Sequence, residues 1–355
     1  MIDPIIIRLM TKMMARFWLS LLLSITVTMH SQIGTTEASL DIGVCYGMMG
    51  NNLPSASDVI GLYKKYGIGK VRLFDPNPAA LEALMGSQID VSLGTRNEDI
   101  QRIASSQEAA NSWFATNVEP YINNTVFQYI SVGNEAIPGP YASYIANAMQ
   151  NLQNILNDRN LAGVSVTTVL SAATLASSYP PSAGAFTAEA RIDLINILKF
   201  LSAQGSPLMV NVYPYFAYAS DPVNIRLDYA QFTATSPVVF DGNLSYTSMF
   251  DAMVDAFFWA MEKEGVANVD VVVSESGWPS AGNGDFTTPE LAATYNKNFI
   301  LRMNKGTPKR PQAYIEGYVF AMFNENLKPE GVEQHFGLFN PNMDPAYPVL
   351  NPVSD

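Results

Sequence analysis

Two glutamates in this sequence follow strand-like apolar runs in the same way. Glu275 lies near the end of the valine-rich run DVVVSES, and Glu135 comes directly after QYISVGN. A carboxylate at such a position is costly to desolvate unless it is hydrogen-bonded or paired. Paired Asp or Glu residues that flank a cleft are the machinery of glycoside hydrolysis, where one protonates the leaving oxygen and the other attacks or activates water. The repeated placement therefore favours a catalytic pair.

Other catalytic groups are scarce in this chain. It contains two histidines, His30 and His335, and a single cysteine, Cys45. A zinc site or a Cys/His protease pair is hard to assemble from so few groups, and the usual Gly-rich nucleotide fingerprints are missing from the sequence. We therefore expect no metal and no cofactor, a surface position for His335, and a buried structural thiol at Cys45. Alternatively, each glutamate caps a helix or pairs with a loop arginine, but two acids in matching contexts favour catalysis.

Composition and charge limit the class of protein and of partner. The 355 residues are 48% hydrophobic and 15% charged, which is ordinary for a globular protein with a large core. The formal net charge is −12, from 20 basic and 32 acidic residues, without a basic cluster that could follow a phosphate backbone. We therefore expect no nucleic acid partner. A neutral polymer is compatible with this charge, whereas adhesion to anionic membranes is not.

Eight strand-like runs, separated by stretches with helical spacing, would position the two glutamates. Strands that alternate with helices imply parallel pairing and right-handed crossovers, and eight such units predict a single α/β domain, a (β/α)8 TIM barrel. A doubly wound open sheet is the alternative. In the barrel, the two acids lie at the C-terminal ends of strands 4 and 7 and can converge on one bond. The runs begin at Ile42, Lys70, Ile89, Gln128, Val164, Pro207, Asp270 and Glu316.

The N-terminus has the composition of a secretory signal peptide. Arg8, Lys12 and Arg16 precede the apolar run FWLSLLLSITV at 17–27, which is too short to span a membrane. We therefore expect residues 1–38 to be a signal peptide that is cleaved from the mature protein.

The rest of the chain is expected to be one secreted domain. We predict a catalytic domain at residues 39–350 and a short tail at residues 351–355, in a monomer without a membrane span. The N-x-[ST] sequons at Asn123 and Asn243 suit a secreted glycoprotein.

Four motifs, SESGWPSAG, VGNEAIPG, IGVCYGMMGNNLPS and FAMFNEN with HFGLFNPN downstream, resemble the plant endo-β-1,3-glucanases of glycoside hydrolase family 17. The similarity runs from about Ile42 to Tyr347. It implies a (β/α)8 barrel and a retaining glycosidase. Carried over to this sequence, the resemblance implies that Glu275 is the nucleophile and Glu135 the general acid/base.

The resemblance also implies four supporting residues near the acids. Glu325, Lys328 and Glu333 match a Glu, a Lys and a second Glu that follow strand 8 in the family, and Asn134 precedes the acid/base. They would set the charge around the acid, and one of the strand 8 residues is a rival candidate for the proton donor. We prefer Glu135, because a strand end holds a carboxylate more rigidly than a loop does.

The substrate that the resemblance implies is a linear β-1,3-glucan such as callose, laminarin or fungal wall glucan, cut internally in plant defence or wall remodelling. Mixed-linkage β-1,3-1,4-glucanases share the fold and motifs, so that activity is one alternative. A glucan-binding defence protein without turnover is another. Vacuolar relatives tend to have a longer C-terminal extension, so we expect an extracellular, apoplastic protein, with the vacuole as the alternative.

A groove for sugar rings needs aromatic platforms, because sugars present apolar C–H faces. We expect substrate contacts from Tyr46, Tyr213, Phe216, Trp278 and Phe323. Strand alternation predicts instead that Tyr215 and Phe320 pack away from the groove. The sequence departs from the family at GTRNED, where V-P-N is more common, and at Phe74, where Tyr is.

Overall fold

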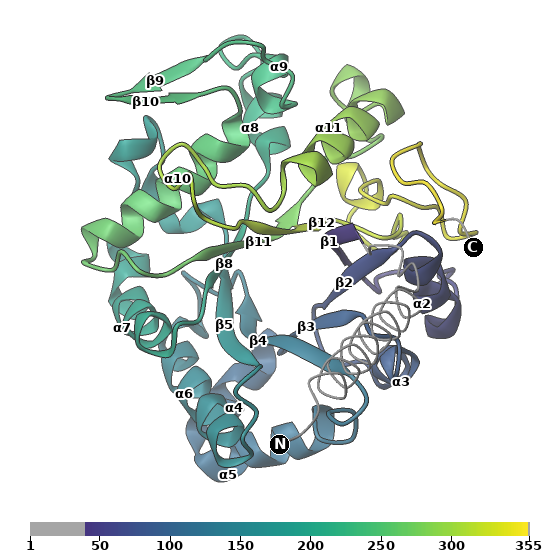
Figure 1. Ribbon diagram of the computed structural model, residues 1–355, viewed down its shortest axis with the longest axis vertical. Coiled ribbons are helices and arrows are strands. Elements are labelled where there is room, and N and C mark those ends of the chain that lie inside the picture. Colours follow the sequence, from purple (N-terminus) through teal and green to yellow (C-terminus); the bar gives the residue numbers. More distant parts are fainter. Residues whose placement is uncertain (1–39, 354–355) are drawn as a thin grey trace, which may run out of the picture. The chain divides into compact units, whose positions relative to one another are not determined.

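Eight parallel strands close into a barrel in the computed structural model, which describes residues 40–353 (Figure 1). Each strand overlaps one of the eight apolar runs, so the predicted (β/α)8 barrel is confirmed and the open-sheet alternative is wrong. The expected signal peptide, residues 1–38, and His30 lie outside the described residues. In order around the barrel, the strands are β1 (Leu40–Cys45), β2 (Ile68–Leu73), β3 (Asp90–Gly94), β4 (Val126–Asn134), β5 (Ser165–Leu170), β8 (Leu208–Asn211), β11 (Val271–Ser276) and β12 (Glu316–Val319).

The strands are apolar because both of their faces are covered. All six residues of β11, VVVSES, are buried, since side chains fill the barrel on one face and helices pack on the other. Strand β12 is shorter than the run EGYVFAMF and ends at Val319. Residues after Val319 therefore do not follow the alternation of a strand.

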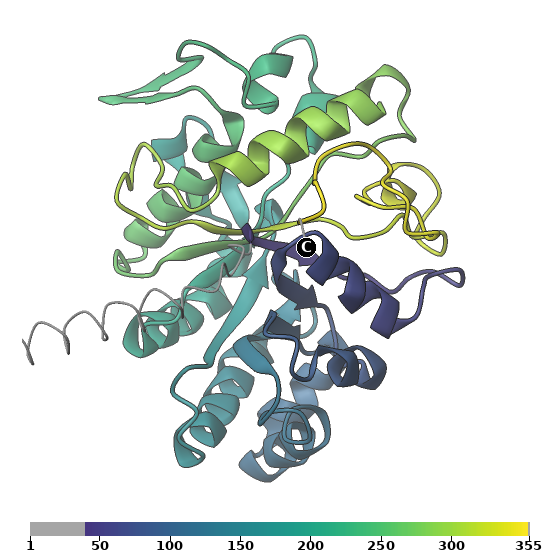
Figure 2. The same ribbon diagram turned by 45° about the vertical axis from the view of Figure 1, so that its right-hand side comes forward.

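Helices connect the strands and surround the barrel (Figures 1 and 2). The loop after β12 lies beside the segment between β1 and the first helix in both views, and the Leu327 amide donates to the Met49 carbonyl there, at 2.9 Å. The helices are α2 (Ala56–Lys65), α3 (Pro78–Leu84), α4 (Ile100–Ser105), α5 (Gln107–Asn117), α6 (Ala142–Asp158), α7 (Ala188–Gln204), α8 (Pro214–Ser220), α9 (Leu227–Ala230), α10 (Met249–Lys263) and α11 (Pro289–Arg302).

Six of these helices begin at a side chain that accepts a hydrogen bond from a first-turn amide, which satisfies an otherwise unpaired donor. In α10, the expected helix rich in Met, Phe and Trp, the cap is Ser248, and Phe250, Phe257 and Phe258 are buried. The interpretation of that stretch as helix packing is therefore confirmed. The six capping residues are Ser55, Asn77, Ser106, Thr187, Ser248 and Thr288.

Short elements decorate the loops. Two antiparallel pairs join β6 (Leu175–Ser177) to β7 (Ala185–Phe186) and β9 (Val239–Asp241) to β10 (Leu244–Tyr246). The 3-10 turns of the described residues are η1 (Asn97–Asp99), η2 (Ala172–Thr174), η3 (Pro181–Ala183), η4 (Gly284–Phe286) and η5 (Val332–Gln334).

Polar groups occupy the N-terminal end of the barrel interior. The Lys70 ammonium lies 2.6 Å from a carboxylate oxygen of Asp41 and 3.0 Å from one of Glu316. Glu316 also accepts hydrogen bonds from Gln128 and from the Tyr318 hydroxyl. Lys70 and Glu316 are both buried, so each charge depends on the other for compensation. This cluster lies at the end of the barrel opposite to the catalytic candidates.

Several smaller predictions can be placed on this fold. Cys45 is fully buried and its thiol donates to the Ser274 carbonyl at 3.3 Å, so the buried thiol is confirmed. Asn123 and Asn243 are both exposed, and their glycosylation stays a prediction. Between residues 40 and 353, no helix combines the length and the apolar character that a membrane span requires.

Candidate active site

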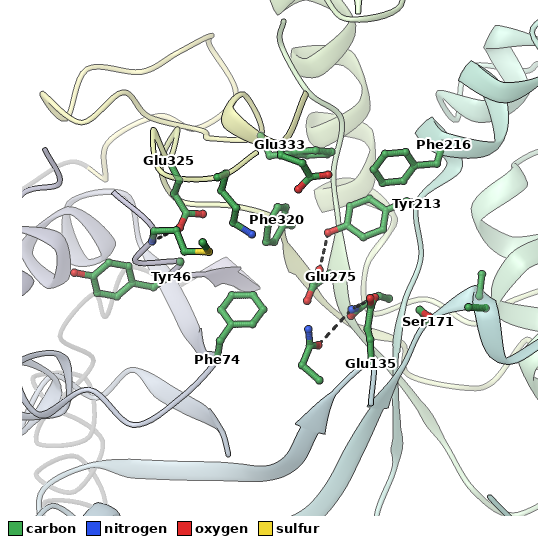
Figure 3. Close-up of a pocket in the computed structure, with 18 of the residues that line it drawn as sticks. Tyr46, Phe74, Glu135, Ser171, Tyr213, Phe216, Glu275, Phe320, Glu325 and Glu333 are labelled. Carbon is green, nitrogen blue, oxygen red and sulfur yellow. Dashed lines mark hydrogen bonds between the residues drawn. The ribbon is translucent and has the colours of Figure 1, made fainter. Parts of the chain in front are cut away.

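A groove of about 840 Å³ opens at the C-terminal end of the barrel (Figure 3). Its walls come from residues at or beyond the ends of β1, β2, β4, β5, β8, β11 and β12, with Met253 from α10. Chemistry in (β/α)8 barrels gathers at this end of the strands. Of the residues singled out from the sequence, it is lined by Tyr46, Asn134, Glu135, Tyr213, Phe216, Glu275, Glu325, Lys328 and Glu333.

Glu275 is held from two sides at the bottom of this groove. The Tyr213 hydroxyl donates to Oε2 at 2.7 Å (Figure 3). One guanidinium nitrogen of Arg72 donates to Oε1 at 2.5 Å. Burial and the nearby charge of Glu275 raise the pKa of Tyr213 well above its usual range, so the phenol stays a donor. Both oxygens of Glu275 therefore act as acceptors and point in a defined direction, as a nucleophilic carboxylate requires.

Arg72 connects the two acidic positions. It is almost fully buried and comes from β2, where it donates to Glu275, to the Asn134 side-chain oxygen at 2.8 Å and to the Ser274 carbonyl at 3.3 Å. Its guanidinium carbon lies 4.4 Å from the centroid of the Phe74 ring. Sequence reasoning missed this residue. The signal was a charged side chain inside the apolar run KVRLF, since a buried arginine needs a partner.

Glu135 also lies at the floor of the groove, directly after β4. Its φ is +50°, which is uncommon for a residue with a side chain, and its amide donates to the Val169 carbonyl at 3.1 Å. Glu135 is an exposed residue, and the groove walls enclose its carboxyl group only in part. Partial desolvation by these walls and the charge of Glu275 raise the pKa of Glu135, against the lowering effect of a hydrogen bond from Asn211.

Asn211 joins the two acids into one network. Its amide nitrogen donates to Glu135 Oε1 at 2.7 Å and lies 3.5 Å from the Asn134 side-chain oxygen, which in turn accepts from Arg72. Its own oxygen accepts from the Ser274 hydroxyl at 2.8 Å. Figure 3 shows Glu135 and Glu275 facing the same cavity. The groove thus brings together one carboxylate held as an acceptor and one carboxyl with a raised pKa.

Comparison with known proteins agrees with this geometry. The model of the glycosyl hydrolases family 17 matches residues 42–350. The chain belongs to this family. The resemblance seen in the sequence motifs is therefore confirmed.

Individual relatives of this family 17 chain cover nearly all of it. A probable glucan endo-1,3-beta-glucosidase of Arabidopsis thaliana, BG4, is 53% identical over 321 residues, which are 89% of this chain and 93% of that protein. The structure of CJP38, a beta-1,3-glucanase and pollen allergen of Cryptomeria japonica, is 50% identical, with a TM-score of 0.83 over 87% of this chain and 98% of that one. A structure from work on two plant beta-glucan endohydrolases with distinct substrate specificities is 46% identical, with a TM-score of 0.84 and coverages of 87% and 99%.

Glu325, Lys328 and Glu333, from the loop after β12, line another wall of the family 17 groove. Glu325 is buried, and its Oε1 accepts the Met49 amide hydrogen at 2.6 Å. Burial raises the pKa of Glu325, while the Met49 amide and Lys328 act in the opposite direction. The Lys328 ammonium lies 5.3 Å from the Phe320 ring centroid, and Glu333 belongs to η5. Glu325 therefore joins the loop after β12 to the loop after β1.

Aromatic rings cluster around Tyr213 in the groove wall. The Tyr213 ring centroid lies 5.4 Å from that of Phe216, 6.1 Å from that of Phe320 and 5.8 Å from that of Phe336, all in edge-to-face arrangements. Phe216 is 43% exposed, so its ring is accessible from the groove. Such rings can pack against the C–H faces of sugars. The structure thus brings Tyr46, Tyr213 and Phe216 to the groove as expected.

Two aromatic residues expected in the groove are elsewhere. Trp278 is fully buried, its ring packs against Tyr215 at 5.2 Å, and its indole N–H donates to the Phe286 carbonyl at 2.9 Å. Phe323 is 2% exposed and does not line the groove. The expectation of sugar contacts from Trp278 and Phe323 is therefore corrected. The buried position of Tyr215 is as expected.

The end of β12 explains why the aromatic positions after it were mistaken. Phe320 was expected to pack away from the groove but lines it, because β12 ends at Val319 and strand alternation no longer applies. Phe323, four residues beyond that end, forms an isolated bridge with Phe339 and turns into the protein. Sequence reasoning also missed other lining residues: Met48, Met49, Phe74, Asn211 and Phe336.

A metal ion in the described part of the chain would need a group of side chains that could hold it. Among residues 40–353, no three His, Cys, Asp or Glu side chains are grouped as a metal would require. His335 is half-buried and does not line the groove. The groove is lined by the carboxyl groups of Asp75, Glu135, Glu275, Glu325 and Glu333. Of these, Glu135 and Glu275 are linked through the hydrogen bonds of Arg72, Asn134 and Asn211.

Proposed function

We propose that this family 17 chain is a retaining endo-β-1,3-glucanase, with Glu275 as nucleophile and Glu135 as general acid/base. The observation that supports the proposal best is the different environment of the two acids in one groove. Arg72 and Tyr213 donate to Glu275, whereas partial desolvation in the groove and the charge of Glu275 raise the pKa of Glu135. Two carboxyl groups whose environments differ in this way are the expected assignment for an acid and a nucleophile.

The mechanism follows from these roles. Glu275 attacks the anomeric carbon while Glu135 gives its proton to the glycosidic oxygen, so the C–O bond breaks and a glycosyl ester forms on Glu275. Glu135, now a carboxylate, takes a proton from water, and the water oxygen displaces Glu275 from the same face that the leaving group occupied. The anomeric configuration is retained, and Glu135 is protonated again for the next cycle.

The groove supports a polysaccharide substrate cut within the chain. It is open, it is lined by several aromatic rings, and the protein around it has a formal charge of −12, which suits a neutral polymer. The similar proteins described above have names that refer to β-1,3-glucan or β-glucan hydrolysis. We therefore infer that glucans such as laminarin or callose are the substrates, with Lys328 and Glu333 setting the charge near the bond that is cut.

Linkage specificity is the part of the proposal that needs the sharpest test, because one similar structure comes from endohydrolases that differ in specificity. We expect laminarin to be degraded to a series of oligosaccharides and mixed-linkage β-1,3-1,4-glucan to be degraded much more slowly. Product analysis on both polymers in parallel, with NMR of the first products to assign the anomer, measures linkage and retention together. Faster release from the mixed-linkage polymer would assign the mixed-linkage activity instead.

Turnover itself is tested by neutralising the nucleophile. Glu275→Gln keeps the size of the side chain and should abolish release of reducing ends from laminarin while the fold and glucan binding remain. Substantial residual activity contradicts the nucleophile assignment. No activity in the unmodified protein, with glucan binding intact, would support a non-catalytic glucan-binding protein.

We also propose secretion to the apoplast, for a role in plant defence or wall remodelling. The basic and apolar segment at the N-terminus supports removal of residues 1–38, and two exposed sequon asparagines support passage through the secretory pathway. N-terminal sequencing of the mature protein and a mass shift on glycosidase treatment test both points. Accumulation in the vacuole would require the alternative location.

A further inference from the structure

Glu135 has an unusual backbone position for a residue that must aim a proton. Its φ of +50° lies in the left-handed region, where the Cβ of a residue with a side chain comes too close to the following carbonyl oxygen. Such a conformation persists only when the surroundings hold it. The contacts made by the residues just before Glu135 therefore decide where its carboxyl group points.

The ladder between β3 and β4 ends before Glu135 is reached. The last paired residues are Gly94 and Ser131, and the Thr95 amide donates to the Ser131 carbonyl at 2.9 Å. Beyond this point, Gly133 and Asn134 have no neighbouring strand backbone on the β3 side to pair with in this register. Their polar groups need other partners.

Side chains from the loop after β3 supply these partners. Asn97 Oδ1 accepts the Asn134 amide hydrogen at 2.9 Å, and Asn97 Nδ2 donates to the Asn134 carbonyl at 3.1 Å. The carboxamide thus pairs with both backbone groups of one residue, as a neighbouring strand would. The Thr95 hydroxyl, on a fully buried residue, accepts the Gly133 amide hydrogen at 3.0 Å.

The β5 side holds the same segment from the other direction. The Glu135 amide donates to the Val169 carbonyl, and the Thr168 hydroxyl donates to the Val132 carbonyl at 2.7 Å. Gly133 makes the close approach possible, because a Cβ at this position would lie 2.7 Å from Ile100 Cδ1 and 3.1 Å from Asn97 Oδ1. The backbone that precedes Glu135 is therefore hydrogen-bonded on both of its edges.

We propose that Asn97 is a positioning residue for the acid/base Glu135, acting through the backbone of Asn134. This inference rests on the proposed function. Asn97 does not line the groove, so it has no direct part in binding the sugar. Its effect must come from where Glu135 holds its proton, and a general acid must lie within hydrogen-bond reach of the leaving oxygen.

The test uses two substrates that differ in their need for the acid. Cleavage of a laminari-oligosaccharide needs a proton on the leaving oxygen, whereas a 2,4-dinitrophenyl β-laminarioligoside has a leaving group that departs without one. The value of kcat/KM reports formation of the glycosyl-enzyme in both cases. We expect Asn97→Ala to lower kcat/KM on the oligosaccharide by about 10- to 100-fold, part of the contribution of a positioned acid, and to change it on the aryl substrate by less than about threefold.

Three further variants make the outcome decisive. Asn97→Asp keeps the acceptor for the Asn134 amide but loses the donor, so a smaller selective loss is expected even if Asn97→Ala folds poorly. Asn151→Ala is the matched control, because this side chain also donates to a carbonyl, that of Ile103 at 2.9 Å, away from the groove. Both substrates should be unaffected by it. Glu135→Ala sets the largest selective loss that can be observed.

The possible results separate the inference from the proposed function. Equal losses on the two substrates, or no loss on either in both Asn97 variants, would overturn the positioning role while Glu135 keeps its assignment. If Glu135→Ala itself shows no preference for the aryl substrate, the proposed acid/base is wrong and the inference fails with it.

Discussion

Replacement of Arg72 by methionine should destabilise the protein strongly, because it leaves a carboxylate without its charged partner. The side chains of Arg72 and Glu275 are 1% and 8% exposed, and their atoms are 2.5 Å apart. Removal of one partner of such a buried pair costs about 3–5 kcal/mol, since the remaining charge stays in a site that water does not solvate well. Methionine fills a similar volume without charge, so a cavity contributes little to this figure.

A double-mutant cycle measures the interaction between the two side chains directly. The free energy of unfolding, from urea titration, is compared for the unmodified protein, Arg72→Met, Glu275→Gln and the double variant. The double variant leaves neither charge in the site, so we expect it to be more stable than the sum of the single effects predicts, by at least about 2 kcal/mol. Arg226→Met, which breaks a pair with Asp228 whose side chains are 57% and 34% exposed, should change stability only slightly.

Either of two results would refute this reasoning about Arg72. One is a loss below about 1 kcal/mol in Arg72→Met, which would mean that Glu275 is solvated without the arginine. The other is additivity of the two substitutions within about 0.5 kcal/mol, which would mean that they do not interact.

Three further predictions concern other titratable groups. Because the pKa of Glu135 is raised, this acid loses its proton at a higher pH than an ordinary glutamate, and kcat/KM on laminarin should fall as pH rises through that pKa. A pH profile whose alkaline limb lies in the ordinary range for glutamate would contradict this. Burial raises the pKa of Asp255 to about 6 from 3.8, so its contribution to stability is present below pH 3.8 and is lost as pH rises through about 6. The free energy of unfolding of Asp255→Asn should lack this decline, and equal pH dependence in the two proteins would disprove the prediction. Glu325→Ala removes the acceptor of the Met49 amide, so KM for laminarin should rise, whereas Glu325→Gln keeps an acceptor oxygen and its KM should stay near that of the unmodified protein. Identical KM values in the two variants would argue against the link between the loops.

The acids themselves could be predicted because their signal is local. Glu275 lies near the end of an apolar run that forms a strand and Glu135 directly after one, and parallel strands in a barrel end on the same rim. The same argument failed for aromatic residues after the last strand. Phe320 and Phe323 were placed by alternation along a strand that in fact ends at Val319, so their directions depend on loop packing. Trp278 likewise follows a strand, but its loop packs its ring under the rim.

Amino-acid order alone determined the number and sequence of the strands, the capped helices between them and the rim on which Glu135 and Glu275 emerge. These features depend on hydrophobic periodicity and on contacts between neighbours in the chain, so they can be predicted from the sequence. Closure of the barrel decided the rest. Arg72 meets Glu275 203 positions away, and Asn211 meets Glu135 76 positions away. Such pairs form only when strand register and loop packing have set the distances between segments, and for this reason the partners that tune each acid belong to the tertiary structure.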